Sequence, residues 1–484
     1  MILDQRLNWK HHITELKSKV NRSLNILRTV TSLGWGADRK VLKRLYWAIG
    51  KSKIEYGCQL YGLHNANAIK PLITLNNEAL RICTGAFRSS PIQSLYVEAE
   101  EPPLDLRWEE LTMRTYYRIK ATTGNQLNNT LDSSLDQLYI EKPKLQRPLG
   151  VRCRLMEEEL NITEEPMPVT TSAIPPWTKR IPKKCLKGKL IKAPSNETHR
   201  ATTFLEHNIV HSNSKSIFTD GSKTDTGTGF AALIDDTYIR GALPTISSIF
   251  TAELSAIEAA SDLIISSTND QFTIYTDSES ALTEISNFGS NHPIAQTIQQ
   301  NLHTAHQDGK DVTICKIPSH VGLTGNEAAD KEARKAANML GPHPNCVPHK
   351  DFYTIFKREK MKKWQARWDE VDPSNKLKRI RPNIGKWTLP SDCSRQYQVK
   401  LSRLRLGHTK LTHGHLMERS HPSTCNFCRT EHVTVQHLLM DCPNLSALRT
   451  THRLPEQMAL LLGESPPLKE LMTFLKEIDV LHLM

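Results

Sequence analysis

Residues 215–340 alternate short β-rich segments with helical ones, in an order that strongly limits the folds open to this part of the chain. Three β-rich segments come first and are joined by tight turns, at 215–222, 228–236 and 237–244. The later segments are predicted to be helix 250–266, strand 271–277, helices 278–286 and 292–307, strand 311–318 and helix 326–340. The order βββαβααβα predicts an α/β domain built on a mixed sheet of five strands.

The rest of the chain reads as helical or irregular. Residues 1–140 are predicted to be mainly helical, because apolar residues recur there at three- and four-residue spacing, as in Ile13, Leu16, Val20, Leu24 and Leu27. Residues 141–211 are rich in Pro, Lys and polar residues, which is typical of a linker. We therefore expect a helical region (1–140), a linker (141–211), the α/β domain (212–341), a basic helical segment (342–420) and a cysteine-bearing tail (421–484).

Composition excludes several classes of protein. The 484 residues are 24% charged and 38% hydrophobic, which fits a globular chain and not a disordered or collagen-like one. No apolar run approaches the ~18–20 residues of a membrane span, and the N-terminal residues lack the apolar core of a secretory signal. Ten mostly scattered cysteines indicate a reducing compartment. We expect an intracellular protein, nuclear or cytoplasmic, with no membrane partner.

The net charge of +12 is unevenly distributed along the chain. Residues 1–211 have a balance of +11, residues 212–340 of −8, residues 351–420 of +10 and residues 421–484 of −2. Single charge runs are usually solvated surface. An acidic module between two basic flanks also suits a polyanion that the flanks hold and the module processes, so we expect nucleic acid as the partner.

Four acidic residues fall near the ends of elements in the α/β domain: Asp220 in the first strand, Glu253 at the opening of the first helix, Asp277 at the end of the fourth strand and Asp330 in the first turn of the last helix. Glu253 shares a helix face with Ile257 and Ile264, so its carboxylate lies on the side expected to pack against the sheet. A buried carboxylate needs a cation or hydrogen-bond partners. Taken singly, each acid is better explained as a turn residue or a helix N-terminal residue than as a metal ligand. The four together would need divalent cations, and oxygen ligands suit Mg²⁺ or Mn²⁺.

Four sequence blocks of this domain closely resemble the ribonuclease H family, in family order: FTDGS (218–222), TAELSAIEAA (251–260), YTDSESAL (275–282) and KIPSHVGLTGNEAAD (316–330). The resemblance implies that the four acids bind two metal ions. It also implies that His320 takes the position of a mobile histidine that assists proton transfer or product release. The implied reaction is hydrolysis of the RNA strand of an RNA–DNA hybrid, with one ion activating water and the other stabilising the leaving 3′ oxygen. Taken alone, His320 would be an ordinary loop histidine.

Selectivity for a hybrid requires contacts to the RNA 2′-hydroxyl. Ser222, Ser278 and Asn326 lie beside the acidic positions and are candidates for this contact. The alternative is that they cap turns and helices, since Ser278 and Asn326 each precede a predicted helix. The sequence favours neither interpretation.

Three cysteines and a histidine lie within 18 residues near the C-terminus: Cys425, Cys428, His437 and Cys442. Three thiolates and an imidazole suit a closed tetrahedral zinc site, which would be structural. Few apolar residues surround the cluster, so we expect zinc to supply most of the folding free energy of this segment. Unrelated buried cysteines are the alternative interpretation, and His432 is a competing ligand.

Blocks outside the α/β domain resemble the C-terminal part of non-LTR retrotransposon polyproteins of the jockey type. LSRLRLGHT (401–409) and the cysteine cluster resemble their tail. Four blocks resemble the region after their polymerase palm: LDQRLNWKHHI (3–13), LGWGADRKVLKRLYWAI (33–49), KIEYGCQLYG (53–62) and ALRICTGAFRSSP (79–91). The aromatic-x-Asp-Asp motif of such polymerases does not occur in the sequence. We therefore expect a truncated polyprotein without polymerase activity, with the element RNA among its partners.

Two functions compete for this chain. The first is a metal-dependent endoribonuclease whose basic helices, at 9–60 and 355–380, contact phosphate. The second is a catalytically silent, nucleic-acid-binding remnant. The complete set of carboxylates favours the enzyme. Met361, Trp364 and Trp368 are expected to form a buried helix face and not a base-stacking surface, and the zinc segment serves either RNA binding or protein assembly.

Overall fold

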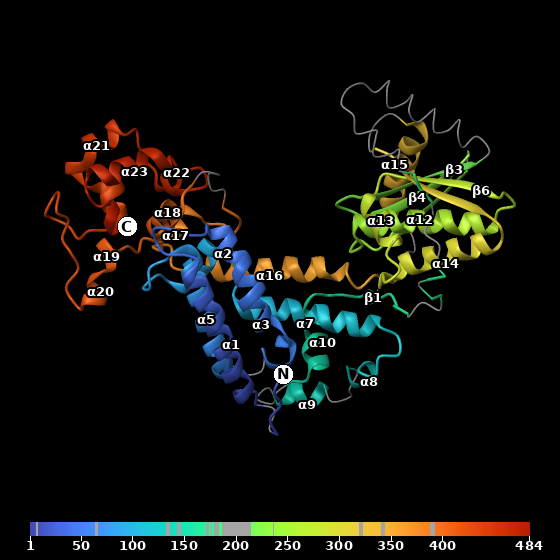
Figure 1. Cartoon of the computed structure of the whole chain (residues 1–484), viewed down its shortest axis with the longest axis horizontal. Helices are drawn as coiled ribbons and strands as arrows, with labels where there is room; N and C mark the ends of the chain where they lie inside the picture. Colours follow the sequence, from blue (N-terminus) through green and yellow to red (C-terminus); the bar gives the residue numbers. More distant parts are fainter. Residues whose placement is uncertain are drawn as a thin grey trace. The chain divides into compact units, whose positions relative to one another are not determined.

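The structure, a computed structural model, describes the whole chain apart from residues 6–7, 63–65, 132–135, 143–146, 171–173, 176, 179–182, 186–213, 236, 319–322, 340–343 and 388–392. It divides into two units (Figure 1). One unit consists of residues 1–112 and 357–484, and the other of residues 113–356. Two helices, α7 (Leu104–Ala121) and α16 (Phe352–Asp369), contribute residues to both units.

The α/β domain of the second unit has the predicted order of elements. Its strands and helices are β3 (Lys215–Lys223), β4 (Thr228–Ile234), β5 (Thr237–Leu243), α12 (Ile249–Ser266), β6 (Gln271–Thr276), α13 (Glu279–Ile285), α14 (Pro293–Gln307), β7 (Asp311–Lys316) and α15 (Thr324–Ala337). The order βββαβααβα is therefore confirmed.

These five strands form the predicted mixed sheet. Strands β3, β4 and β5 pair antiparallel, whereas β6 is parallel to both β3 and β7. A sixth strand, β2 (Lys183–Cys185), pairs parallel with the outer edge of β7. β2 falls within the predicted linker, because its three residues, two of them lysines, carry no recognisable strand pattern.

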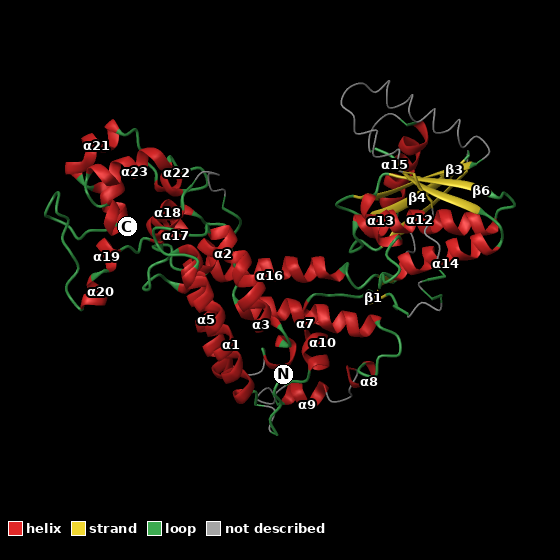
Figure 2. Ribbon diagram, viewed as in Figure 1, coloured by secondary structure: helices red, strands yellow, loops and turns green. Residues whose placement is uncertain are grey.

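Helices cover both faces of this sheet. Figure 1 shows α15 over one face and α12 and α14 under the other, and Figure 2 shows the strands of the domain enclosed between them. The alternation of side chains along β3 explains the layers. Ile217 packs with Leu254 and Ile257 of α12, whereas its neighbour Phe218 packs on the opposite face with Leu323 at the start of α15.

Where the structure describes it, the remainder of the second unit is helical with one short strand pair. Its elements are α8 (Asn128–Leu131), α9 (Asp136–Glu141), α10 (Leu149–Glu159), β1 (Glu165–Pro166) and β8 (Cys346–Val347). β1 pairs parallel with β8, and Cys153 of α10 is buried with Tyr117 and Phe352. Residues 149–166 thus pack into this unit, although residues 141–211 were predicted to be a linker from their Pro, Lys and polar content.

The first unit is helical in the part of the chain that the structure describes. Its N-terminal elements are α1 (Lys10–Thr29), α2 (Arg39–Tyr46), η1 (Trp47–Lys51), α3 (Ser52–Glu55), α4 (Cys58–Tyr61), α5 (Ala66–Thr84) and α6 (Ile92–Ala99). Its C-terminal elements are α17 (Lys376–Ile380), α18 (Arg395–Leu406), α19 (Lys410–His413), α20 (His415–Glu418), η3 (His437–Asp441), η4 (Pro443–Leu445), α21 (Ser446–Thr451), α22 (Met458–Leu462), α23 (Leu468–Glu477) and η5 (Leu481–Leu483). The five apolar residues predicted to face the core from 11–30 are all buried in α1. Among the described helices, none is both long and apolar enough to cross a membrane.

Trp364 and Trp368 of α16 are buried in the core of the first unit, and the indole of Trp368 donates a 2.9 Å hydrogen bond to the Arg381 carbonyl. Their interpretation as a core face is confirmed. Partly buried Met361 packs against the same core. These aromatic rings are therefore occupied by protein contacts and are not a surface for stacking bases.

Several basic residues of the flanks are internal. Arg405 is fully buried, donates to the carbonyls of Leu462 and Gly463 at 2.7 and 2.6 Å, and lies 3.6 Å from the centroid of the Trp387 ring. Buried Arg39 donates to Glu98 at 2.9 Å. The expectation that the basic flanks contact nucleic acid is thus wrong for these arginines, because their hydrogen bonds hold the helical unit together.

Candidate active site

The register of the sheet brings two of the predicted acids together. Strands β3 and β6 run parallel, with Phe218 paired opposite Tyr275. Their rings stack at 5.0 Å between centroids and 20° between planes. Asp220 and Asp277 each lie two residues further along, on the same side of their chains. The carboxyl ends of two adjacent parallel strands therefore present two carboxylates side by side.

Glu253 joins them from helix α12. The side chain of Ser248 caps this helix by accepting a hydrogen bond from the Thr251 amide at 3.1 Å. Glu253 follows in the second turn, one turn later than predicted. Gly221 allows the helix to approach β3, since a β-carbon there would lie 2.6 Å from the Glu253 nitrogen. As a result, carboxylate oxygens of Asp220, Glu253 and Asp277 all lie within 4.8 Å of one another.

Burial and mutual repulsion perturb this cluster. Burial, with smaller contributions from the carboxylates of Asp277 and Asp330, raises the pKa of Asp220 to about 7. Burial, together with Asp220 and Asp277, raises the pKa of Glu253 to about 9. Both side chains are more than nine-tenths buried, whereas Asp277 is partly exposed. Without a cation, the cluster would hold protons at neutral pH.

The residues present fit divalent cations. The Glu253 Oε2 atom is buried and accepts no hydrogen bond, which is costly for a carboxylate oxygen unless a cation binds it. Three carboxylates offer the hard oxygen ligands that Mg²⁺ and Mn²⁺ take. The partly exposed Asp277 leaves one side of the cluster accessible from solvent.

Asp330 is near the cluster but outside its 4.8 Å group. It lies in the second turn of α15, not in the first turn as predicted, and its charge contributes to the raised pKa of Asp220. Two hydrogen-bonding distances of 2.9 and 2.8 Å join its carboxylate to the guanidinium of Arg334. Arg334 was not among the site residues predicted from the sequence. The Asp-x3-Arg spacing on a helix is the signal that would have found it.

The other proposed site residues differ in burial and in their hydrogen bonds. Ser222 is buried in β3. Ser278 caps α13 by accepting from the Ala281 amide at 3.3 Å, as its structural interpretation predicts. Asn326 does not precede its helix but lies within α15, buried and with a side-chain oxygen that accepts no hydrogen bond, so it caps nothing. His320 lies outside the described residues.

The predicted zinc ligands also converge. The sulfur and nitrogen atoms of Cys425, Cys428, His437 and Cys442 all lie within 4.8 Å of one another. The two closest contacts join Cys425 to Cys442 at 3.9 Å and Cys428 Sγ to His437 Nε2 at 3.4 Å. His432, the competing ligand, does not belong to this group.

Residues beside the cysteine cluster tune its ligands. The Thr430 hydroxyl donates to Cys428 Sγ at 3.2 Å, and this bond, with backbone amides, lowers the pKa of the Cys428 thiol to about 6. His437 Nδ1 lies 3.1 Å from the Glu431 carboxylate, leaving Nε2 directed to the cysteines. Carboxylates beside metal-binding histidines often orient the ring through a hydrogen bond; here the two groups are close, but Nδ1 does not form a hydrogen bond. The residues present therefore fit a thiolate-rich metal site.

The apolar surroundings of the cysteine cluster are larger than predicted. Val433, Val435, Leu438 and Leu439 are buried and continue into the core of the first unit, which includes Leu471 and Phe474 of α23. The expectation that zinc supplies most of the folding free energy is therefore wrong for this segment, because it packs on a core that the rest of the unit also builds.

The fold and its acidic edge define an α/β domain with a candidate divalent-cation centre. Residues 212–338 match the family profile described as RNase H. This part of the chain is therefore a ribonuclease H domain, which indicates a hydrolase acting on nucleic acid. None of the curated proteins compared with the chain matches it.

Proposed function

We propose that the domain hydrolyses the RNA strand of RNA–DNA hybrids, with two Mg²⁺ or Mn²⁺ ions held by Asp220, Glu253, Asp277 and Asp330. The observation that carries this proposal is the convergence of three carboxylates, from two parallel strands and a helix, within 4.8 Å. The match of residues 212–338 to the RNase H family supports the choice of substrate.

The protein groups have distinct roles in this mechanism. When bound, the cations supply an activated water and neutralise charge on the phosphate during in-line displacement. Glu253, held by α12 against Gly221, provides the buried ligand. Asp277, which is partly exposed, provides the ligand on the side that a phosphate can reach. His320 is proposed to move a proton at the leaving oxygen.

Recognition of RNA would use groups beside the carboxylates. Asn326 has an unsatisfied side-chain oxygen and is the strongest of the three candidates for the 2′-hydroxyl. Ser222 and Ser278 remain candidates, although Ser278 also caps α13. Exposed basic residues of the helical unit would hold the rest of the polyanion.

The flanking blocks support an origin in a non-LTR retroelement, and the cysteine cluster is proposed to bind a structural Zn²⁺ ion. The geometry of Cys425, Cys428, His437 and Cys442 supports this second metal. Whether that segment binds element RNA or a protein partner is tested by its own variants, described below.

The test is cleavage of a labelled RNA–DNA hybrid by the full chain in Mg²⁺. Asp277→Asn is expected to abolish cleavage while leaving hybrid binding intact. The matched control is Asp308→Asn, an exposed aspartate at the end of α14 that should not affect the rate. Cleavage that is equal in the wild type and in Asp277→Asn would end the proposal.

A catalytically silent binding protein is the competing function, and one observation favours it. Arg334 neutralises Asp330, the fourth acid of the set. Such a protein would bind the hybrid with unchanged affinity in the wild type and Asp277→Asn, and neither would cleave it. Measuring binding and cleavage on the same samples separates the two functions.

A further inference from the structure

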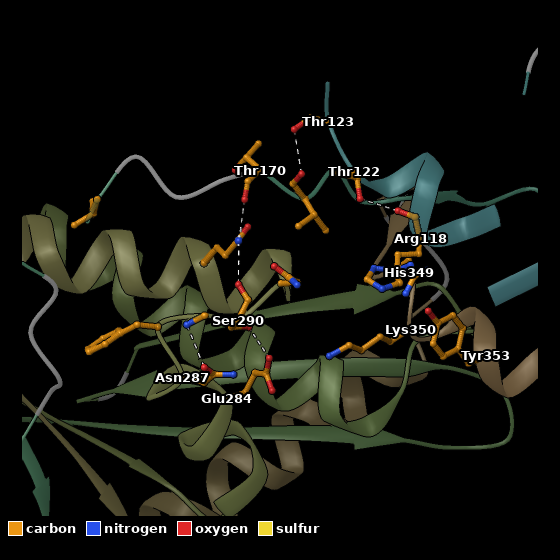
Figure 3. A pocket seen from close by; sticks show the side chains of 16 residues that line it. Arg118, Thr122, Thr123, Thr170, Glu284, Asn287, Ser290, His349, Lys350 and Tyr353 are labelled. Carbon is orange, nitrogen blue, oxygen red and sulfur yellow. Dashed lines mark hydrogen bonds between the residues drawn. The ribbon is translucent and has the colours of Figure 1, made fainter. Parts of the chain in front are cut away.

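A polar cavity of about 780 Å³ lies in the second unit, apart from the carboxylates (Figure 3). The lining residues come from four parts of the chain: the end of α7 with the turn that follows, residues 169, 170 and 174, the connection between α13 and α14, and residues 349, 350 and 353. Its volume falls within the range of small-ligand sites, about 300–1,000 Å³. The cavity would accommodate a single nucleotide but not a duplex.

Hydrogen bonds fix the walls of this cavity. Gln296 of α14 donates both to the Thr170 carbonyl at 2.9 Å and to the Ser290 carbonyl at 3.0 Å. The segment that carries His349 and Lys350 is held against α12, because the Asp351 carboxylate accepts a 2.7 Å hydrogen bond from the Thr251 hydroxyl. The cavity is thus built from segments that are already held in place.

Two basic residues in the cavity lining, Arg118 and Lys350, form no ion pair among the described residues. Both side chains are exposed. Figure 3 shows the Lys350 side chain extending toward the wall that carries Ser290 and Glu284. Glu284, an acid in the lining, accepts a 2.5 Å hydrogen bond from the Ser290 hydroxyl.

His349 supplies a buried ring nitrogen that has no hydrogen-bond partner among the described residues. Its side chain lies in the lining beside Arg118 (Figure 3), and the residue is only 6% exposed. Its Nδ1 atom forms no hydrogen bond within the described chain. A polar atom buried without a partner is costly, and burial lowers the pKa of His349 to about 4, so the ring is neutral at physiological pH. A ligand in the cavity would satisfy this nitrogen.

We propose that this cavity binds the phosphate of a nucleotide unit, through Arg118, Lys350 and His349. Two unpaired cations and a hydrogen-bonding ring match a phosphate. Asn287 and Asn291, which also line the cavity, offer amides to the edge of a base. The phosphate would come either from a free nucleotide or from the end of a strand.

The test is calorimetric titration of the full chain carrying Asp277→Asn, without added Mg²⁺, so that neither cleavage nor metal binding contributes. We expect adenosine 5′-monophosphate to bind and adenosine to bind at least about tenfold more weakly. Arg118→Gln and Lys350→Gln should each weaken nucleotide binding about tenfold. Because both side chains are exposed, these variants should fold. The matched control, Lys357→Gln, changes an exposed lysine on α16 outside the lining and should bind as before.

A third ligand, a 5′-phosphorylated RNA tetranucleotide, separates the two sources of phosphate. Tighter binding than the mononucleotide would assign the cavity to strand ends, and weaker binding to free nucleotides, and both support a phosphate site. The proposal is overturned if the mononucleotide does not bind, if adenosine binds equally well, or if both cavity variants bind as the wild type does. None of these outcomes depends on hybrid cleavage.

Discussion

Glu253 reaches the acidic cluster because Gly221 has no side chain. A β-carbon on Gly221 would lie 2.6 Å from the Glu253 nitrogen and 2.8 Å from the preceding carbonyl carbon of Ala252. Both are backbone atoms, so the obstacle cannot rotate away. The close packing of β3 on α12 therefore sets how near the carboxylates of Asp220 and Glu253 come to each other.

Gly221→Ala should separate these two carboxylates. Overpacking of this kind costs about 1–3 kcal/mol of stability, and the displaced helix should weaken Mg²⁺ binding about tenfold. Thermal unfolding and a Mg²⁺ titration would measure the two effects. Gly34→Ala is the control, because a β-carbon at Gly34 meets nothing within 4 Å. Unchanged Mg²⁺ affinity in Gly221→Ala would show that the packing does not set the site.

The stabilisation of the protein by Mg²⁺ should grow with pH. Asp220 and Glu253 have pKa values raised from 3.8 and 4.5 to about 7 and about 9. The folded state thus holds protons that the unfolded chain has already released, so without metal these groups make stability fall as pH rises from about 4 to about 9. Mg²⁺ binds the ionised carboxylates and cancels this loss.

Melting curves between pH 5 and pH 9, with and without Mg²⁺, would measure this effect. Buried histidines such as His292, whose pKa burial lowers to about 3, titrate in the opposite sense. The difference between the two curves removes their contribution, because Mg²⁺ does not bind them. In Glu253→Gln, the stabilisation by Mg²⁺ should increase with pH much less than it does in the wild type. A Mg²⁺ effect independent of pH in the wild type would contradict the assignment of these carboxylates as ligands.

Removal of zinc should loosen residues 421–445 without unfolding the first unit. Val435 and Leu438 are buried in the core shared with α23, so that packing persists when the metal is lost. Cys425→Ser and Cys442→Ser should each lose the bound zinc, measured by metal analysis, and lose amide protection within this segment, measured by hydrogen exchange.

Cys346→Ser is the control, since Cys346 is an exposed cysteine outside the cluster. RNA affinity of the zinc-free variants then separates the two roles of the segment. Weaker RNA binding would indicate recognition of RNA, and unchanged affinity would indicate protein assembly. Full zinc content in both variants would rule out the proposed ligand set.

Sequence patterns predicted the α/β domain well for a physical reason. Its strands and helices each carry a clear period, and the parallel pairing of β3 with β6 brings Asp220 and Asp277 side by side. The same reasoning failed for α10 and β2. Their short, charged segments are ordered by tertiary contacts, such as the burial of Cys153, that no local pattern encodes.

The charge of a sequence segment was the poorest guide to its role in the structure. Counting Lys and Arg predicted two basic surfaces, but a count does not distinguish an exposed cation from a buried one. Arg405 is part of LSRLRLGHT, where it alternates with leucines, and it is fully buried. For Arg334 the error was an omission: its contact with Asp330 was not predicted, although the two residues are one helical turn apart, a spacing at which opposite charges commonly pair.

Buried and exposed arginines should therefore respond differently to mutation. Arg405→Ala removes a guanidinium that satisfies two carbonyls and lies 3.8 Å from fully buried Glu98. Because the buried Glu98 carboxylate then has one cation fewer beside it, the free energy of unfolding should fall by about 3–5 kcal/mol. Arg358→Gln, on the exposed face of α16, should leave stability unchanged and weaken nucleic-acid binding at low salt.

Chemical denaturation and a salt titration of RNA binding would measure both effects. Loss of one phosphate contact should reduce the slope of log affinity against log salt by about 0.7–0.9. If Arg358→Gln alters stability and leaves the salt slope unchanged, α16 does not contact phosphate. If Arg405→Ala unfolds at the same denaturant concentration as the wild type, the buried contacts of Arg405 do not contribute to stability.

Arg334 should compete with metal for Asp330. Its guanidinium is 59% exposed and Asp330 is 24% exposed, so the ion pair contributes only about 0–1 kcal/mol to stability. Arg334→Gln frees the carboxylate to complete the set of four acids. We expect Mg²⁺ to bind about threefold to fivefold more tightly, with little change in melting temperature in the absence of metal.

Isothermal titration with Mg²⁺ would measure the gain, and Asp330→Asn should show the opposite change. Lys331→Gln is the matched control, because Lys331 is exposed on the same helix turn and forms no ion pair among the described residues. Weaker Mg²⁺ binding in Arg334→Gln would mean that Arg334 holds Asp330 in position for the metal and does not block it. The sign of this one change thus decides whether the Arg334–Asp330 pair inhibits the site or organises it.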